Sequence, residues 1–520
     1  MRSGGSVRIR FALIGALLAA GAAGEAAWAQ PDPRYWDLEE VTAQLDAWAL
    51  AYPHIFHREI IGHTLVDQEP IWAVKISDNA AQPEPEARVL IKAAMHGNEA
   101  NGTNAIMFML DRLLTRYGQS PYYTNMVDNL EMWFVPILNV DGFKICFSGG
   151  PNWSLWRKTK RDNNGDGQYT YPHDGVDPNR NWDYRWQEYA ETNPSSLRYK
   201  GPYPWSEPEI VVMRDLILRE RPVLVMDLHS PDVPSIGNKI WWVWYDPSNG
   251  QYSPDADIFQ PISIALGNRC ETETSGVYVN GSGPSYNELP KEQCWVYKNT
   301  GICAFLMEIS LQYWWTGATV DTIAARTGRG LFYLMERALT GPGVKGIVSS
   351  AGSGAPLRAQ VVVSQVHSPT IGPRLTEESF GQYWRLLLSG NYTVTASAPG
   401  HQPLTQSAYV GSGGWTTLNF ALQPDPASGV EGDLSSPRLL WADAPLRGGG
   451  SVYFRLEEPG RVSLRLLDAT GRRVATLLDG EVGAGVRAVP VGGSLPSGSY
   501  LLLLKADPGI RAAGRVVWIE

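Results

Sequence analysis

The first two thirds of the chain alternate between helical patterns and continuous apolar runs. Residues 36–55 repeat apolar side chains at helical spacing, and residues 320–341 do the same before Pro342. Continuous apolar runs bounded by polar residues are typical of buried strands. Three such runs occupy residues 88–94, 222–228 and 301–310. This order predicts an α/β domain over residues 30–341, with a mixed central sheet flanked by helices.

The pattern changes after Pro342 to short alternating runs divided by Gly, Ser and Pro, which is typical of all-β structure. A chain of 520 residues is too long for a single hydrophobic core, so several domains are expected. We predict two all-β sandwich-like modules, at 342–423 and 451–520. A linker rich in Pro, Ser and Gly is expected to join them at 424–450.

Each of the three apolar runs leads to a side chain that can bind a metal or transfer a proton. The first leads to His96 and Glu99 in the sequence H-G-N-E, and the second leads to His229. Two imidazoles, one carboxylate and a water molecule form a catalytic zinc site, whereas structural sites use four protein ligands. The third run carries Glu308, which either forms a buried ion pair or acts as general base beside zinc-bound water. We favour the catalytic interpretation, because sites in open α/β sheets form outside the carboxyl ends of the strands.

Further motifs accompany these residues in a fixed order. They are L-N-x-D-G-F at 138–143, L-W-R-K-T at 155–159, G-V-D-x-N-R-N-W at 175–182, S-E-P-E at 206–209 and L-H-S at 228–230. With H-G-N-E and the late Glu308, this order resembles the zinc carboxypeptidase superfamily of the A/B and N/E types over residues 34–341. The resemblance implies one Zn²⁺ ion bound by His96, Glu99 and His229. Glu308 would then activate the water.

The resemblance also assigns roles to side chains around the zinc. Asp177 would accept a hydrogen bond from His96 and fix its tautomer. Arg157 would stabilise the negative charge that develops on the substrate carbonyl. Asn179 and Arg180 would hold the terminal carboxylate of the substrate, since a guanidinium group bonds a carboxylate through two parallel hydrogen bonds.

The resemblance suggests two more substrate contacts. From the spacing of the motifs around it, Tyr286 matches the family's mobile substrate-capping tyrosine, with Tyr278 as the alternative. Asp246, in the segment 240–247 that reads as one strand, is the candidate acid for selecting a basic C-terminal residue. The same aspartate could instead open a turn. Because the relatives' other selector position holds Gln293, basic and apolar or mixed preferences both stay open.

The N-terminus has the pattern of a secretory signal peptide. Three arginines precede the apolar stretch 11–23, and a small-x-small sequence at 27–29 offers a cleavage site before Gln30. The stretch is short for a membrane span, and no later segment reaches the required ~20 apolar residues. We therefore predict that residues 1–29 are a signal peptide and that the protein is secreted, either extracellular or at the cell surface, with the periplasm as an alternative.

Composition limits the partners of the chain. A formal net charge of −9 argues against nucleic acid, because phosphate binding requires basic patches. All four cysteines fall in the α/β domain, where export would permit disulfides. The sequence does not choose among the three full pairings.

A polar segment in the α/β domain has the alternation of a calcium loop. Asp162, Asn164 and Asp166 copy the oxygen ligands of its first half. His173 stands where an EF-hand needs a bidentate glutamate, so a tight polar turn is favoured over Ca²⁺.

The two C-terminal modules resemble parts of known secreted enzymes. Residues 344–363, followed by residues 381–401, resemble the transthyretin-like sandwich that follows the catalytic domain in the N/E subfamily. The last module resembles immunoglobulin-like and sorting modules of secreted bacterial enzymes, and would attach the protein to a cell surface or act as a spacer.

The sequence as a whole predicts a secreted zinc carboxypeptidase that acts on peptide or protein C-termini. One alternative is a zinc amidase or endopeptidase acting on peptidoglycan peptides or acyl-amino acids. Another is an inactive surface binding protein, against which the presence of Glu308 with all three zinc ligands argues.

Overall fold

The computed structural model describes most of two compact units, Met1–Asp425 and Pro426–Glu520. In the first unit it describes residues 31–425, apart from 151, 231–236, 247–250, 272–277 and 282–289. In the second it describes residues 440–519, apart from 443–445, 448–449, 457–459, 469–471, 484, 492–497 and 507–509. The predicted signal peptide lies outside these residues. Among the described residues, no helix is both long and apolar enough to cross a bilayer.

An eight-stranded mixed sheet forms the centre of the first unit, with strand order β1-β2-β4-β3-β5-β10-β6-β9. Its strands are β1 (Phe56–His63), β2 (Pro70–Ile76), β3 (Ala87–Ala93), β4 (Leu130–Val135), β5 (Leu224–His229), β6 (Lys239–Trp242), β9 (Val279–Gly281) and β10 (Cys303–Glu308). The four central strands β4, β3, β5 and β10 are parallel. Strands β1 and β2 pair in antiparallel fashion with their neighbours, whereas β6 is antiparallel to β10 and parallel to β9. The three predicted apolar strands are β3, β5 and β10, so the prediction of a mixed sheet is confirmed.

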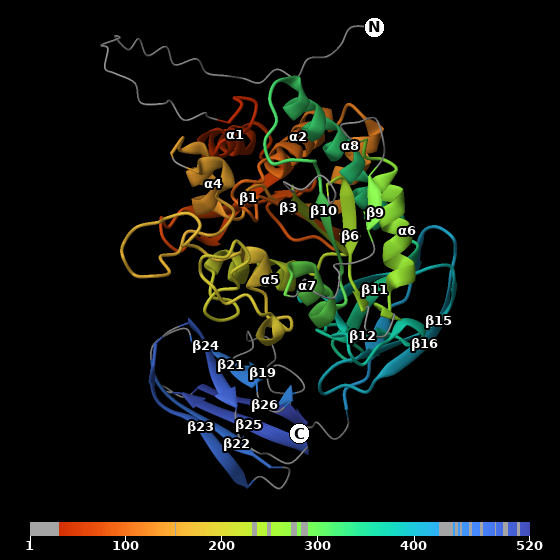
Figure 1. Ribbon diagram of the computed structural model, residues 1–520. Coiled ribbons are helices and arrows are strands. Elements are labelled where there is room, and N and C mark those ends of the chain that lie inside the picture. Colours follow the sequence, from red (N-terminus) through yellow and green to blue (C-terminus); the bar gives the residue numbers. More distant parts are fainter. Residues whose placement is uncertain are drawn as a thin grey trace, which may run out of the picture. The chain divides into compact units, whose positions relative to one another are not determined.

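Eight helices accompany this sheet in the described part of the first unit (Figure 1). They are α1 (Leu38–Ala51), α2 (Asn101–Arg116), α3 (Pro121–Val127), α4 (Val140–Phe147), α5 (Pro208–Glu220), α6 (Ala256–Gly267), α7 (Glu292–Thr300) and α8 (Ala318–Thr340). Asp37 caps the start of α1, because its side chain accepts the backbone N–H of Glu40 in a capping box. The helix ends at Ala51, since Tyr52 precedes Pro53 and the residue before a proline is disfavoured in the helical conformation. Helices α1 and α8 confirm the two predicted amphipathic helices.

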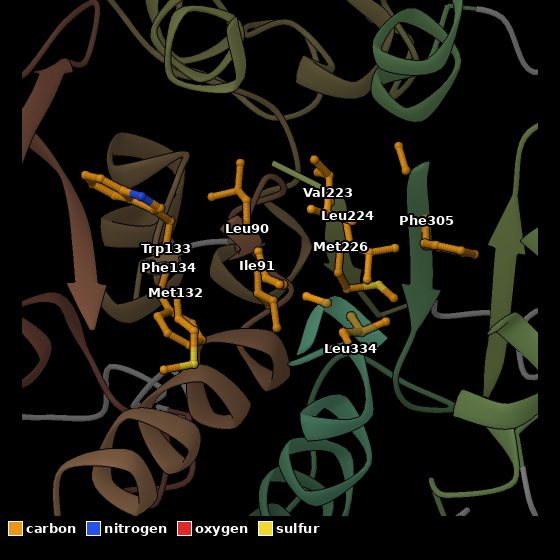
Figure 2. Close-up of a cluster of buried hydrophobic side chains, with 14 of the residues drawn as sticks. Leu90, Ile91, Met132, Trp133, Phe134, Val223, Leu224, Met226, Phe305 and Leu334 are labelled. Carbon is orange, nitrogen blue, oxygen red and sulfur yellow. The ribbon is translucent and has the colours of Figure 1, made fainter. Parts of the chain in front are cut away.

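The core occupies both faces of the sheet (Figure 2). Leu90 and Ile91, which are adjacent on β3, point to opposite faces, as alternate residues of a strand must. Leu334 of α8 lies on the same side as Ile91 and Met226. Because apolar side chains and helices cover both faces, polar chemistry is confined to the strand ends.

The β region that follows α8 is a two-sheet sandwich. Its strands are β11 (Gly343–Ser350), β12 (Gln360–Val363), β13 (Arg374–Leu375), β14 (Gln382–Leu386), β15 (Gly390–Ser397), β16 (Leu404–Val410), β17 (Trp415–Thr417) and β18 (Phe420–Leu422). One sheet has the order β14-β11-β17, with β18 also paired to β11, and the other has the order β13-β12-β15-β16. The sandwich shares one continuous hydrophobic core with the α/β domain, and buried Arg385 pairs with Asp255 at 2.5 Å. It therefore packs as part of the first unit.

The second unit is also all-β and has its own core. Its strands are β19 (Leu440–Ala442), β20 (Leu446–Arg447), β21 (Gly450–Leu456), β22 (Gly460–Leu467), β23 (Arg473–Val482), β24 (Gly485–Val491), β25 (Gly498–Ala506) and β26 (Ile510–Ile519). They form sheets of order β19-β21-β24 and β20-β26-β25-β22-β23, around buried residues such as Phe454, Leu464 and Leu502. Strands β19 and β20 fall inside the predicted linker 424–450. The module starts earlier than expected because Leu440 pairs with Phe454, a contact that composition does not reveal.

Removing residues 426–520 is expected to leave the predicted peptidase activity unchanged, measured as kcat/KM for a peptide with a free C-terminus. The second unit has a separate core, and none of the predicted site residues lies in it. The measurement compares a chain ending at Asp425 with the full chain. As a control, a chain ending at Thr340 deprives Asp255 of Arg385 and should unfold at a lower temperature. A large loss of activity in the Asp425 variant would contradict a spacer or sorting role for the second unit.

Candidate active site

The candidate site lies at the carboxyl ends of three adjacent strands. Strand β3 leads into the turn that carries His96 and Glu99, β5 ends at His229, and β10 ends at Glu308. Strand β5 lies between β3 and β10, and the β5–β10 register places Glu308 directly beside His229. All three predicted zinc ligands are buried, with at most 2% of each residue exposed. Sheet topology thus brings together the four residues that the sequence singled out.

The three ligands converge on one point. Nδ1 of His96 and Nδ1 of His229 lie 3.1 Å apart. Glu99 reaches both rings, with Oε1 2.8 Å from Nδ1 of His96 and Oε2 2.8 Å from Nδ1 of His229. Tetrahedral zinc, with ligand bonds of ~2.0–2.1 Å, requires donor atoms about 3.3 Å apart. Two imidazoles and one carboxylate at this spacing fit a catalytic zinc ion.

Each imidazole also meets a carboxylate on its far side. Nε2 of His96 lies 3.1 Å from Oδ1 of Asp177, as predicted, and Nε2 of His229 lies 2.6 Å from Oδ2 of Asp227. A carboxylate at Nε2 holds the proton there and leaves Nδ1 free for the metal. Although burial opposes it, His229 and Lys92 lower the pKa of Asp227 to about 2.

Asp227 was missed from the sequence, yet a signal for it exists. It stands two residues before His229, and side chains two apart on a strand share a face. A carboxylate inside the apolar run 222–228 could therefore have been assigned to the second histidine, as Asp177 was to the first.

Glu308 has the environment of a general base. Part of the residue stays open to solvent, while its Oε2 atom has no hydrogen-bond partner among the described residues. Burial of the carboxyl group raises the pKa of Glu308 to about 7; the charge of Glu99 adds to this rise and that of His229 opposes it. A base with a pKa near the working pH is the most effective one.

Arg157 forms salt bridges with the predicted zinc ligand Glu99 and with Asp177. Its Nη1 lies 3.2 Å from Oε1 of Glu99, and its Nη2 lies 3.1 Å from Oδ2 of Asp177. Burial opposes its charge, but Asp177 and Glu99 raise the pKa of Arg157 above its usual value. In turn, although burial acts the other way, Arg157 holds the pKa of Asp177 well below its usual range. The site thus keeps a fixed positive charge beside the metal position.

The predicted carboxylate clamp follows Asp177 directly. Asn179 and Arg180 lie in a 3-10 turn, Pro178–Arg180, which begins where the Asp177 side chain accepts the N–H of Asn179. Arg180 is 4% exposed and donates to the carbonyl of Asn179 and to the hydroxyl of Tyr189. Because Asp177 also contacts His96 and Arg157, one aspartate links the zinc ligand, the positive charge and the clamp.

The two further substrate contacts are not placed by the structure. Tyr286 lies outside the described residues. Its alternative, Tyr278, is 3% exposed and donates its hydroxyl to the carbonyl of Ile309 at 2.7 Å, so it is a core residue and not a mobile cap. Asp246 lies in a short strand, β7 (Tyr245–Asp246), paired with β8 (Gln251–Tyr252), and its side chain is outside the described part.

The segment 240–247 does not form the single strand expected from its apolar residues. It divides into β6 and β7, because Ser253 binds the backbone between them. The Ser253 hydroxyl donates to the carbonyl of Val243, and its N–H donates to the carbonyl of Trp244. Gln293, the other selector position, is buried at the start of α7.

The candidate calcium loop and the four cysteines complete the description of the α/β domain. Asp162 accepts the backbone N–H groups of Gly165 and Gly167, which forms a tight polar turn in that segment. All four cysteines are buried, and none of them forms a disulfide.

A convergent His-Glu-His site with an adjacent glutamate and a fixed arginine, at the end of a mixed sheet, is typical of zinc-dependent hydrolases. The chain belongs to the zinc carboxypeptidase family, whose model, described as "Zinc carboxypeptidase", matches residues 41–319. Residues 343–423 match a second model, described as "Carboxypeptidase regulatory-like domain". The two matches agree with the α/β domain and the first sandwich.

Individual relatives are distant. Carboxypeptidase D from Homo sapiens is 25% identical over 397 residues, which are 73% of this chain and 26% of that protein. The chain thus spans about a quarter of the length of this relative. Carboxypeptidase A2 from Rattus norvegicus is 29% identical over 184 residues, covering 35% of this chain and 41% of the relative.

A solved structure supports the fold. The crystal structure of thrombin activatable fibrinolysis inhibitor aligns with a TM-score of 0.50 and 20% identity, covering 58% of this chain and 77% of that one. At this identity the likeness concerns the fold alone.

Proposed function

We propose that this chain is a zinc-dependent carboxypeptidase that removes the C-terminal residue of peptides or proteins. One observation carries the proposal: Asp177 holds the zinc ligand His96, and the same side chain opens the turn that presents Asn179 and Arg180. A carboxylate bound by Arg180 would therefore lie beside the metal. This arrangement favours cleavage of the last peptide bond over cleavage inside a chain.

Each residue of the site has a separate role in the proposed reaction. Bound zinc would polarise the scissile carbonyl and lower the pKa of its water to about 7. Glu308 would accept a proton from the attacking water and later return it to the leaving amine. Arg157 offers its fixed charge to the developing oxyanion, and Arg180 with Asn179 orients the substrate through its terminal carboxylate.

A single assay tests the proposal against its alternatives. Matched peptides with free and amidated C-termini are incubated with the zinc-loaded protein, with and without a chelator. A carboxypeptidase cleaves the free acid in a metal-dependent manner and leaves the amide almost intact. Equal cleavage of both would favour the amidase or endopeptidase, and no cleavage of either would favour a surface binding protein.

The pH profile should report Glu308. Its raised pKa, about 7, means that the carboxylate form is lost as the pH falls through that value, so kcat/KM should fall on the acidic side. The positive charge of bound zinc favours the carboxylate and moves this limb to lower pH. The measurement is kcat/KM from pH 5 to 9, and a rate that rises toward acid would contradict the assignment.

Secretion and specificity belong to the same proposal. The arginine-flanked apolar stretch before Gln30 supports export, and N-terminal sequencing of exported protein should begin at Gln30. We also propose a preference for basic C-terminal residues, with Asp246 as the selecting acid. Comparing kcat/KM for peptides ending in Arg and Phe, with the parent and Asp246→Ala, tests this preference. The second unit would attach the protein to a cell surface or act as a spacer.

A further inference from the structure

Lys92 is a charged side chain near the carboxyl end of the apolar strand β3. It is fully buried, and its Nζ lies 2.6 Å from Oδ1 of Asp227 and 2.7 Å from Oε2 of Glu292. Both carboxylates are buried as well. A buried ammonium group is costly unless it is paired, and two buried carboxylates without a cation would repel each other. Lys92 therefore keeps both acids in place.

Each of these two acids touches a different part of the active site. Asp227 lies 2.6 Å from Nε2 of the zinc ligand His229. Glu292 begins helix α7, and its backbone N–H donates to Oδ1 of Asn179 at 3.1 Å. That contact occupies the oxygen of the Asn179 amide and leaves its NH₂ group to donate elsewhere. Contacts through Lys92 thus connect the metal site to the carboxylate clamp.

We propose that Lys92 is a positioning residue, which orients His229 through Asp227 and Asn179 through Glu292. Its effect on Asn179 rests on the carboxypeptidase function proposed above. Its effect on metal binding does not, because zinc affinity is measured without substrate. Outer partners of metal ligands commonly change metal affinity by ~10–100-fold, which sets the size of the expected effect.

The principal test replaces Lys92 by Met, which keeps most of the length of the side chain and removes its charge. Zinc affinity, measured by competition with a chelator at fixed pH, should fall ~10–100-fold. KM for free-acid peptides should rise as well. The matched control is Lys75→Met: Lys75 is 3% exposed on β2 of the same sheet and pairs with Glu131 at 2.5 Å, away from the zinc ligands. It should lose stability but keep the zinc affinity of the parent.

Further variants keep the test decisive if Lys92→Met folds poorly. Glu292→Gln removes the charged partner of Lys92 at the start of α7, next to Asn179, so KM should rise. The variant leaves Lys92 paired with Asp227, so zinc affinity should stay unchanged. In the double variant with Lys92→Met, the Glu292→Gln change removes the repulsion and should restore part of the zinc affinity.

Three results would overturn the proposal. They are parent-like zinc affinity in Lys92→Met, an equal loss of affinity in Lys75→Met, and a parent-like KM in Glu292→Gln. If the parent cleaves no peptide but zinc affinity falls in Lys92→Met alone, the proposed function fails and the metal-positioning role stands.

Discussion

Replacing Glu308 by Gln should lower kcat by about 100- to 10,000-fold while zinc remains bound. Glutamine keeps the size of the side chain but cannot accept the proton of the attacking water. The metal should stay because His96, Glu99 and His229 form their contacts without Glu308. Steady-state kinetics on a free-acid peptide and the zinc content of the purified variant provide the measurement.

A second glutamate with a raised pKa provides a control for Glu308→Gln. Glu209 on α5 is completely buried, and burial together with Glu207 raises its pKa to about 8. It shares with Glu308 a pKa raised by burial, but it is more completely enclosed and lies on a helix and not at the strand ends. Glu209→Gln should therefore keep the kcat of the parent. Near-normal turnover in zinc-loaded Glu308→Gln would show that another group is the base.

The zinc site could be predicted from the sequence because its signals are local. His96, Glu99, His229 and Glu308 each end or follow an apolar run, and in a parallel sheet such ends meet at one edge. The prediction needed only the presence of the strands and not their order. The resemblance to zinc carboxypeptidases then supplied Asp177, whose Oδ1 lies 3.1 Å from Nε2 of His96 in the structure.

The Lys92 contacts could not be predicted in this way. Lys92 and Asp227 are direct partners in the register between β3 and β5, strands that lie far apart in the chain. In the sequence, each looks like an isolated polar interruption of an apolar run. Their pairing follows from the strand order, which the sequence pattern does not specify. The contact between Arg385 on β14 and Asp255 at the start of α6, 130 residues apart, was hidden because it depends on how the sandwich packs against the α/β domain.

Arg180→Ala is expected to give the second large effect, on substrates with a free C-terminus. Arg180 is 4% exposed and forms no salt bridge with the described residues, so its charge is available for a substrate carboxylate. Breaking a buried charge pair in the transition state costs ~2–5 kcal/mol, or about 30- to 5,000-fold in kcat/KM. Amidated peptides, already poor substrates, should lose much less.

The nearby Arg185 provides the control for Arg180→Ala. It pairs with Glu188 at the surface, its side chain is 31% exposed, and such pairs contribute ~0–1 kcal/mol. Arg185→Ala should therefore leave kcat/KM for both kinds of peptide nearly unchanged. If Arg180→Ala lowers the cleavage of free-acid and amidated peptides by the same factor, the guanidinium group does not recognise the terminal carboxylate. The preference for the last peptide bond would then need another source.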